Sequence, residues 1–329
     1  MISAPSRLHF GLFSVGGAGA LQFGGSGLMI KSPQTVITAT QATAFAASGP
    51  GHQACHRAIE NWFKTMRISL AQTLGIEQLA DLPVKLQIES LPPRHSGFGS
   101  GTQLALSSVV SVIRLLELPL PSPVELVTAV GRGKRSGIGS HGFFQGGFLI
   151  DRGKLPEDPL APLDFHTDFP EPWSIVTVIH RAAVGLSGDL ETNAFADLAK
   201  TTQSQRDEML EIVRSKIMPG VVLSDYDTFA DGVYEFGLRS GMMFAGIQNG
   251  AYNGPQIESL VNQIRNFGVN AVGQSSWGPC VFAITRDDSD ARQLADFLQS
   301  EHGDECEIEI TKADNQGAKT LIHPPARVR

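Results

Sequence analysis

The sequence predicts an α+β protein of two domains, residues 1–165 and 166–329. Its 329 residues are enough for about two domains of roughly 150 residues each. A proline-rich stretch without periodicity, residues 154–172, marks the boundary between them. Beyond that stretch the predicted order is strand, helices, strand, strand, helix and strand, which is typical of an α+β sandwich.

The first half is expected to alternate strands and helices. Its glycine-rich start predicts short strands joined by tight turns, whereas the later segments show period 2 or helical spacing of apolar side chains. The predicted elements are short strands over 1–31, a strand at 35–46, a helix at 52–74, a strand at 83–90, a buried helix at 102–116, a helix at 124–130 and a strand at 147–151.

The second half follows the same reasoning. β-Branched runs predict strands, and apolar side chains on one stripe predict helices. The predicted elements are strands at 174–180, 270–272, 280–285 and 306–311, and helices at 195–218, 225–240, 256–267 and 291–300. The last few residues are expected to fray.

Composition excludes several classes of protein. The net charge is −7, from 33 acidic and 26 basic residues, which argues against nucleic acid as the main partner. Cys55, Cys280 and Cys306 form no CxxC pair, so neither a disulfide framework nor a zinc site is expected. The N-terminus lacks the pattern of a secretory signal, and no apolar run approaches the roughly 18 residues of a membrane span. We therefore expect a cytoplasmic protein with no membrane partner.

A first glycine-rich loop leads directly into the buried helix. Gly97, Gly99 and Gly101 leave room for close approach to the backbone, and Ser100 and Thr102 add hydroxyl groups. The start of a helix carries unpaired N–H groups and partial positive charge. The loop therefore predicts a cradle for an anion, most often phosphate. The alternative is only a tight strand-to-helix turn. The two hydroxyls could cap the helix or bind phosphate or a metal, and capping and ligand binding do not exclude each other.

A second glycine-rich loop, residues 131–142, carries a cluster of three basic residues in a chain whose net charge is negative. Arg132, Lys134 and Arg135 precede Ser136, and arginine can pair bidentately with phosphate. We expect them to bind the charged part of a substrate, the alternative being a solvated basic turn. His141 follows, as a proton carrier or as an exposed histidine.

Two further segments complete the candidate site. A third loop, residues 273–279, offers Gln274, Ser275 and Ser276, which could orient a polyphosphate or an aromatic acid, or merely form a hairpin. Arg7 and His9 alternate along the first strand, so both side chains are expected on one face. A buried, hydrogen-bonded His9 is the alternative to a functional one.

Three glycine loops in this order resemble the GHMP kinase superfamily over almost the whole chain. The motifs are Ala4-Pro-Ser-Arg-Leu-His-Phe-Gly-Leu, Gly97-Phe-Gly-Ser-Gly-Thr and Gly273-Gln-Ser-Ser-Trp-Gly-Pro. The resemblance implies an N-terminal α/β domain, a C-terminal ferredoxin-like α+β domain and a cleft between them.

The chain departs from the kinases of this superfamily at the positions that carry the chemistry. Many of those kinases place a catalytic aspartate after a Ser-Gly-hydrophobic step, but here Ser136-Gly-Ile is followed by Gly139. A glycine cannot remove a proton from an alcohol. The resemblance also leads one to expect a metal-binding glutamate about one and a half turns upstream, but the stretch Val127-Thr-Ala-Val-Gly-Arg has no acid near that place.

Together, the motifs resemble one branch of the superfamily, the β-ribofuranosylaminobenzene 5′-phosphate synthases. The resemblance implies that 5-phosphoribosyl 1-diphosphate reacts with 4-aminobenzoate or 4-hydroxybenzoate, releasing CO2 and diphosphate, in tetrahydromethanopterin biosynthesis. It also implies Mg²⁺, with ligands unknown, and a homodimer.

Within that reading each loop has an expected role. Lys134 and Arg135 would stabilise the leaving diphosphate, and His9 would orient the acceptor. Substrate binding is expected from the following residues: Arg7, Gly97, Gly99, Ser100, Gly101, Thr102, Arg132, Ser136, Gln274, Ser275 and Ser276. Two alternatives stay open, a small-molecule kinase that takes its base from elsewhere, such as His141, and a non-catalytic ligand sensor.

Overall fold

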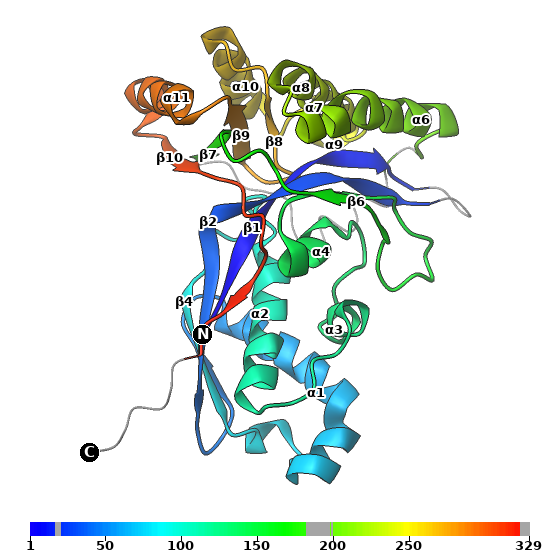
Figure 1. Ribbon diagram of the computed structural model, residues 1–329, viewed down its shortest axis with the longest axis vertical. Coiled ribbons are helices and arrows are strands. Elements are labelled where there is room, and N and C mark those ends of the chain that lie inside the picture. Colours follow the sequence, from blue (N-terminus) through cyan, green and yellow to red (C-terminus); the bar gives the residue numbers. More distant parts are fainter. Residues whose placement is uncertain (17–20, 182–197, 199, 323–329) are drawn as a thin grey trace.

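The computed structural model describes residues 1–16, 21–181, 198 and 200–322. Two sheets organise this part of the chain (Figure 1). The order in the first sheet is β11-β1-β2-β4-β3, with β5 paired to β2 and β6 to β5. Its strands are β1 (Ile2–Ser14), β2 (Phe23–Gln41), β3 (Ala46–Ser48), β4 (Val84–Ser90), β5 (Phe148–Asp151), β6 (Leu163–Thr167) and β11 (Lys319–Thr320).

Helices of the first half pack on this sheet, in the lower part of Figure 1. Leu106, Val109 and Ile113 of the buried helix meet Trp62 of the long first helix and Leu86 of β4 in one apolar core. The helices are α1 (His52–Leu74), the short 3-10 turn η1 (Leu79–Asp81), α2 (Ser100–Leu115), α3 (Pro123–Ala129) and α4 (Ile138–Gln145).

The second sheet is antiparallel, in the order β10-β7-β9-β8. Its strands are β7 (Ser174–His180), β8 (Val272–Gln274), β9 (Cys280–Thr285) and β10 (Cys306–Thr311). Alternate residues such as Val176 and Val178 face α10 and α11 in one core. The helices are α6 (Gln203–Ile212), the π-helix η2 (Val213–Ile217), α7 (Met218–Leu223), α8 (Tyr226–Met242), α9 (Ala245–Gln248), α10 (Pro255–Phe267) and α11 (Asp288–His302).

A shared core joins the two halves. The ring of Phe10 on β1 lies 5.1 Å from that of Phe282 on β9 and 6.3 Å from that of Phe229 on α8, measured between centroids. Phe98, in the first glycine loop, is 1% exposed within the same cluster. Aromatic contacts of this kind fix the halves against each other, so the space between them is held by packing rather than by a loose linker.

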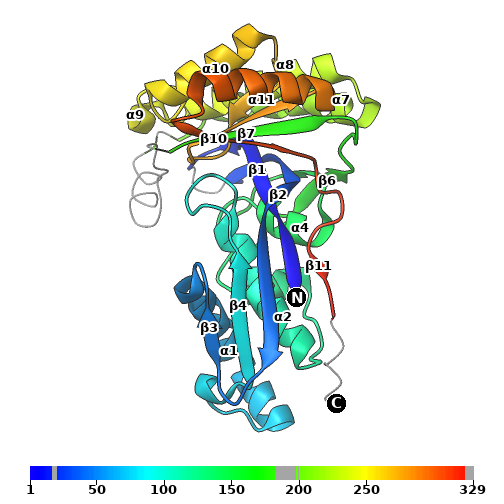
Figure 2. The ribbon, with the colours of Figure 1, turned by 90° about the vertical axis from the view of Figure 1, so that its left-hand side faces the viewer.

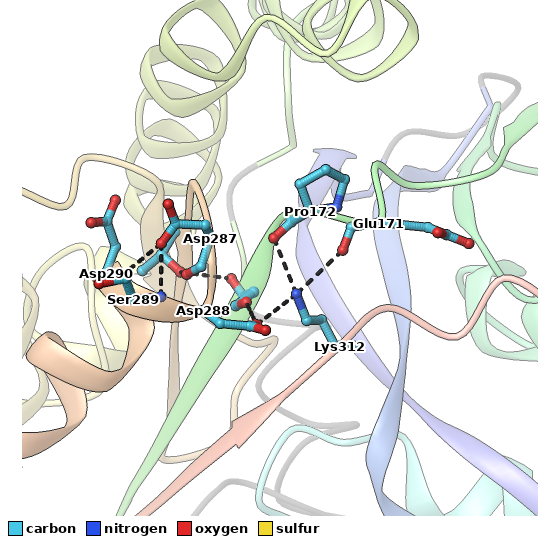
Figure 3. Close-up of polar contacts among 9 residues, drawn as sticks. Glu171, Pro172, Asp287, Asp288, Ser289, Asp290 and Lys312 are labelled. Carbon is cyan, nitrogen blue, oxygen red and sulfur yellow. Dashed lines mark hydrogen bonds and ion pairs between the residues drawn. The ribbon is translucent and has the colours of Figure 1, made fainter.

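The segment after β10 returns from the second sheet to the first (Figure 2). The Lys312 ammonium lies 2.7 Å from the Asp288 carboxylate at the start of α11, and it donates to the carbonyl oxygens of Glu171 and Pro172 (Figure 3). Beyond it, β11 pairs with the edge of β1. Lys312 thus connects the segment between β6 and β7 to the start of α11, at the point where the chain passes from the first sheet to the second.

The predicted fold class is confirmed, with local differences. Instead of short strands, the described residues among 1–31 form the long strand β1 and the start of β2. These strands pair closely because Gly25 and Gly27 of β2 face the β1 backbone at distances that no side chain would allow. Helix α4, strand β6 and the short β3 and β11 were not predicted. Of the helix predicted at 195–218, residues 195–197 and 199 lie outside the described residues, and the first helix begins at Gln203. The last residues, 323–329, also lie outside them, and the domain division at 165/166 stays a prediction.

No helix in the described ranges is both long and apolar enough to cross a membrane.

Candidate active site

A cleft of about 650 Å³ opens between the two halves. Its walls are the strand β1, the first glycine loop before α2, the second before α4, the α8–α9 region and the third loop between β8 and β9. All three glycine loops predicted from the sequence therefore meet at one place. Its size is that of an ordinary small-molecule site.

The start of α2 faces this cleft without a side-chain cap. Gly99 precedes the helix in the left-handed conformation, with φ of 68°, and the N–H groups of Thr102 and Gln103 bond to its carbonyl oxygen. The hydroxyls of Ser100 and Thr102 make no side-chain cap bond at this helix start, and their binding of phosphate stays a prediction. The first N–H groups of α2 are positioned to receive an anion, together with the cations described below.

Two glycines in these loops are required by contact between the loops rather than by a ligand. A Cβ on Gly97, whose φ is 102°, would lie 2.3 Å from the carbonyl oxygen of Ser275. A Cβ on Gly278 would lie 2.2 Å from the amide nitrogen of Gly97. The first and third loops therefore touch backbone to backbone. Gly97 thus has a structural role beside the expected approach of a ligand to this loop, which stays a prediction.

Arg7 lies against the first loop from β1. Its backbone N–H donates to the carbonyl of Phe98 at 2.9 Å, and its Nη1 donates to the carbonyl of Gly97 at 3.3 Å. A Cβ on Gly139 would lie 3.8 Å from the Arg7 Nε. Gly139, where the resemblance leads one to expect a catalytic aspartate, is therefore beside a guanidinium.

His9 faces the cleft two residues further along β1, as predicted from their alternation. Its ring Nε2 lies 3.1 Å from the Ser136 hydroxyl, and its backbone N–H donates to the Ser275 hydroxyl at 3.0 Å. Burial, with the nearby charge of Arg7, holds the pKa of His9 well below its usual value. The imidazole is consequently neutral at physiological pH.

Asp151 completes this network and was not identified from the sequence. Fully buried at the end of β5, its carboxylate accepts from the Ser136 hydroxyl at 2.7 Å and from the N–H groups of Gly137 and Gly153. Burial raises the pKa of Asp151, and these donors lower it in part. A carboxylate that closes an apolar strand was the only available signal, and it is also typical of an ordinary strand end.

The second loop brings its predicted cations into the cleft. Arg132, Lys134 and Arg135 all line it, and buried Lys154 fixes the loop by donating to the carbonyl of Gly133 at 3.1 Å. The Arg132 guanidinium packs against Gly101 at the start of α2. The pKa of Arg132 is lowered mainly because surrounding cleft atoms displace water from its guanidinium, and secondly by the charge of a neighbouring arginine. Part of the side chain nevertheless stays exposed to solvent.

That neighbour is Arg57 on α1, and Arg94 lines the cleft as well. Neither was identified from the sequence, because Arg57 reads as the exposed face of an amphipathic helix. With Arg7, six lysine and arginine side chains line the cleft, whereas no aspartate or glutamate of the described ranges does. The cleft is thus locally cationic in a protein of net charge −7.

This donor set does not fit a Mg²⁺ ion held by the protein. Mg²⁺ is usually bound through one or two carboxylates together with substrate phosphates and water. Within the described part of the chain, no group of three His, Cys, Asp or Glu side chains could hold a metal. The nearby Asp151 uses its carboxylate on Ser136, Gly137 and Gly153 and does not line the cleft.

The third loop forms the opposite wall together with apolar side chains. Gln274 and Ser276 line the cleft, where Gln274 accepts from the N–H of Asn253 at 2.7 Å. Ser275 does not line it: its fully buried hydroxyl accepts from the His9 N–H and donates to the carbonyl of Gly97. Trp277 packs edge-on against Phe244, and both line the cleft.

His141 lies outside this site. Its Nε2 bonds to the carbonyl oxygen of Ala161 at 2.8 Å, and its side chain is not among those that line the cleft. The geometry gives it no path to a substrate hydroxyl there.

Comparison with known proteins agrees with this arrangement. The family model "GHMP kinases N terminal domain" matches residues 61–146, and "GHMP kinases C terminal" matches residues 217–305. The solved mevalonate kinase of Methanococcus jannaschii superposes with a TM-score of 0.66, at 15% identity, over 96% of this chain and 98% of that one. The chain belongs to the GHMP kinase superfamily, as its motifs predicted.

Within the superfamily, the similarity is to one kind of synthase. A curated protein named β-ribofuranosylphenol 5′-phosphate synthase, from Archaeoglobus fulgidus, is 29% identical and covers 98% of this chain and 99% of its own length. Another of that name, from Methanothermobacter thermautotrophicus, is 28% identical over 87% of this chain and 88% of its own. The predicted branch is thus confirmed, with a phenol in the relatives' names where we expected an aminobenzene.

Proposed function

We propose that this protein is a β-ribofuranosylaminobenzene- or β-ribofuranosylphenol-5′-phosphate synthase, a decarboxylating pentosyltransferase. It joins 5-phosphoribosyl 1-diphosphate to 4-aminobenzoate or 4-hydroxybenzoate, releasing CO2 and diphosphate, in tetrahydromethanopterin biosynthesis. The observation that carries the proposal is a kinase-type cleft that is cationic and has a glycine, Gly139, in place of the base. The names of the similar proteins support it over a kinase or a non-catalytic sensor.

The leaving diphosphate belongs at the start of α2. The N–H groups of the first turn lie there, Arg132 packs against Gly101, and Lys134 and Arg135 line the same cleft. When the bond between the anomeric carbon and the diphosphate oxygen breaks, its electron pair leaves with the diphosphate. Positive groups held there in advance stabilise that developing charge. The electron-poor anomeric carbon is left facing the acceptor.

The acceptor belongs between Arg7 and the apolar wall. Phe244, Trp277, Arg7 and Gln274 all line the cleft. We assign the ring to the side of Phe244 and Trp277, and the carboxylate to Arg7 and the amide of Gln274. The ring carbon that bears the carboxylate attacks the anomeric carbon. The bond to the carboxylate then breaks, its electron pair restores the aromatic ring and CO2 leaves. No proton is lost overall, which agrees with the absence of a carboxylate base at residue 139.

Mg²⁺ stays part of the proposal in a restricted form. The cleft offers hydroxyls but, within the described ranges, no carboxylate to hold the ion. We therefore assign it no protein ligand and treat it as a companion of the diphosphate substrate. A cytoplasmic location and a homodimer are likewise proposals, and light scattering after size exclusion would test the dimer.

Release of labelled CO2 tests the function directly. The protein is incubated with 5-phosphoribosyl 1-diphosphate, Mg²⁺ and carboxyl-labelled 4-aminobenzoate or 4-hydroxybenzoate. Release that requires both substrates supports the synthase, and the ratio between the two acids identifies the acceptor. Absence of release with both acids from folded protein would contradict it, and ATP consumption with alcohols would then favour the kinase. Lys134→Ala and Arg135→Ala should each slow diphosphate release by more than a few-fold, since they stabilise its charge.

A further inference from the structure

A chain of hydrogen bonds runs from a buried carboxylate to the cleft. Asp151 accepts from the Ser136 hydroxyl at 2.7 Å, and the Ser136 oxygen lies 3.1 Å from Nε2 of His9. All three side chains are held independently of any ligand. Asp151 also binds Gly137 and Gly153, and His9 is also bound through its backbone to Ser275.

The direction of these bonds fixes the tautomer of His9. An ionised carboxylate only accepts, so the single proton of Ser136 points to Asp151. The Ser136 oxygen must then accept from its other neighbours, which are the backbone N–H of Ile138 at 3.3 Å and Nε2 of His9. The proton of the neutral imidazole therefore lies on Nε2, and Nδ1 carries a lone pair. In the described part of the chain, Nδ1 has no hydrogen-bond partner.

The place of His9 along β1 suggests what that lone pair meets. Arg7 lies at the cationic end of the cleft, beside Gly97 and Gly139. Leu12 lies at the apolar end, with Phe244. His9 is between them, two residues from Arg7, which is about 7 Å along an extended strand. This spacing is close to the distance between the two ends of a benzoate that carries a para substituent.

We propose that Asp151 is a positioning residue that, through Ser136, holds His9 with its Nδ1 as acceptor for the para O–H or N–H of the benzoate. The inference rests on the proposed function and deepens it. A hydrogen bond to Nδ1 increases the electron density that the para atom donates to the attacking ring carbon. The proton stays on the substrate, so the atom balance of the substitution is unchanged. The depressed pKa of His9 agrees with an imidazole that accepts rather than donates.

Asp151→Asn tests the direction of the chain. Oδ2 of Asp151 accepts from both Ser136 and Gly137, so an amide NH2 in its place gives up the Gly137 bond and donates to the Ser136 oxygen. The Ser136 proton then turns to Nε2 of His9 and leaves the proton of the ring on Nδ1. Nδ1 of His9 then changes from acceptor to donor. The readout is the ratio of kcat/KM with 4-hydroxybenzoate to that with 4-methoxybenzoate, whose para oxygen only accepts. We expect this ratio to fall by about tenfold or more, mainly through kcat for the hydroxy acid.

Controls separate this role from a structural one. Asp314 is a second buried aspartate, and its carboxylate accepts from the backbone N–H groups of Gln316 and Gly317. Because Asp314 lies outside the cleft, Asp314→Asn should leave the ratio unchanged. If Asp151→Asn fails to fold, Ser136→Ala removes the same link while both backbone bonds of Asp151 persist, and it should lower the ratio too.

Equal loss of kcat/KM with both acids, in either folded variant, would overturn the inference while the synthase proposal stands. If wild-type protein releases no CO2 that depends on 5-phosphoribosyl 1-diphosphate, the proposed function fails, and the role of Asp151 in it fails as well.

Discussion

Introducing an aspartate at residue 139 tests directly whether Arg7 binds the anionic group of the substrate. Gly139 is the second residue of α4, its φ is not positive, and a Cβ would meet nothing closer than Gln103 at 3.7 Å and Arg7 at 3.8 Å. An acid in the first turn of a helix is favourable. Gly139→Asp should therefore fold, and its carboxylate would reach the Arg7 guanidinium.

The expected loss of kcat/KM follows from pairing of Arg7 with the new carboxylate, because the paired guanidinium no longer attracts the substrate. Two unit charges about 4 Å apart interact by about 4 kcal/mol at an effective dielectric constant near 20, and by about 1 kcal/mol in water. Arg7 is half-buried, so its value lies between these limits. At about 1.4 kcal/mol for each factor of ten, kcat/KM for the benzoate should fall by a factor between about 5 and about 700.

Labelled CO2 release at several benzoate concentrations measures this loss. Gly139→Ala is the matched control, because it adds the Cβ without the charge and should keep kcat/KM within a few-fold of wild type. If Gly139→Asp retained wild-type kcat/KM while folded, Arg7 would not bind an anionic group of the substrate. Gain of ATP-dependent phosphorylation of an alcohol by this variant would instead show that only the base separates this cleft from a kinase.

Further predictions address the cations, the metal, the glycine contact and pH. Arg57→Ala and Arg132→Ala should each weaken pyrophosphate binding by about three- to thirtyfold in calorimetry, since each removes a cation from an acid-free cleft, and unchanged affinity would exclude a role in diphosphate binding. Pyrophosphate should still bind measurably in excess EDTA, because side chains supply the positive charge, whereas complete loss would show that the metal is needed for binding. Gly97→Ala should cost about 2–5 kcal/mol in urea unfolding, from its positive φ and the 2.3 Å approach, and Gly246→Ala, with nothing within 4 Å, should cost almost nothing. Because folding lowers the pKa of His9, the unfolded chain binds its proton first, so stability should decline as pH falls from about 6.5 toward the lowered value. His9→Asn should remove that part of the decline, and identical pH profiles would contradict the cause.

Local periodicity was sufficient where a segment's own residues decide its structure. The helix predicted at 52–74 and the strands at 174–180, 280–285 and 306–311 have the predicted bounds, because apolar spacing and β-branching act within each segment. Helix α4 was missed, because Gly139 and Gly142 lower its intrinsic propensity and packing against β1 and β2 stabilises it.

The candidate site divides in the same way. Glycine spacing and clustered cations indicated the three loops, since both signals are local in the sequence. Asp151 could not be found this way, because its role depends on Ser136, 15 residues earlier, and on His9 at the other end of the domain. Ser275 was expected to contact substrate, and only the packing of the third loop on the first shows that its hydroxyl is buried between them.

The backbone contact between Gly97 and Gly278 also bears on how such a cleft can arise. The floor of the phosphate-binding loop is built by residues some 180 positions later in the chain, so the first half alone would carry the cations without the surface that shapes them. The site can therefore form only after both halves have docked. If two related genes exchanged one half, the first loop of one protein would meet the third loop of another, and the two loops would not have evolved together. A single methyl group added at Gly97 or Gly278 would then push the two loops apart.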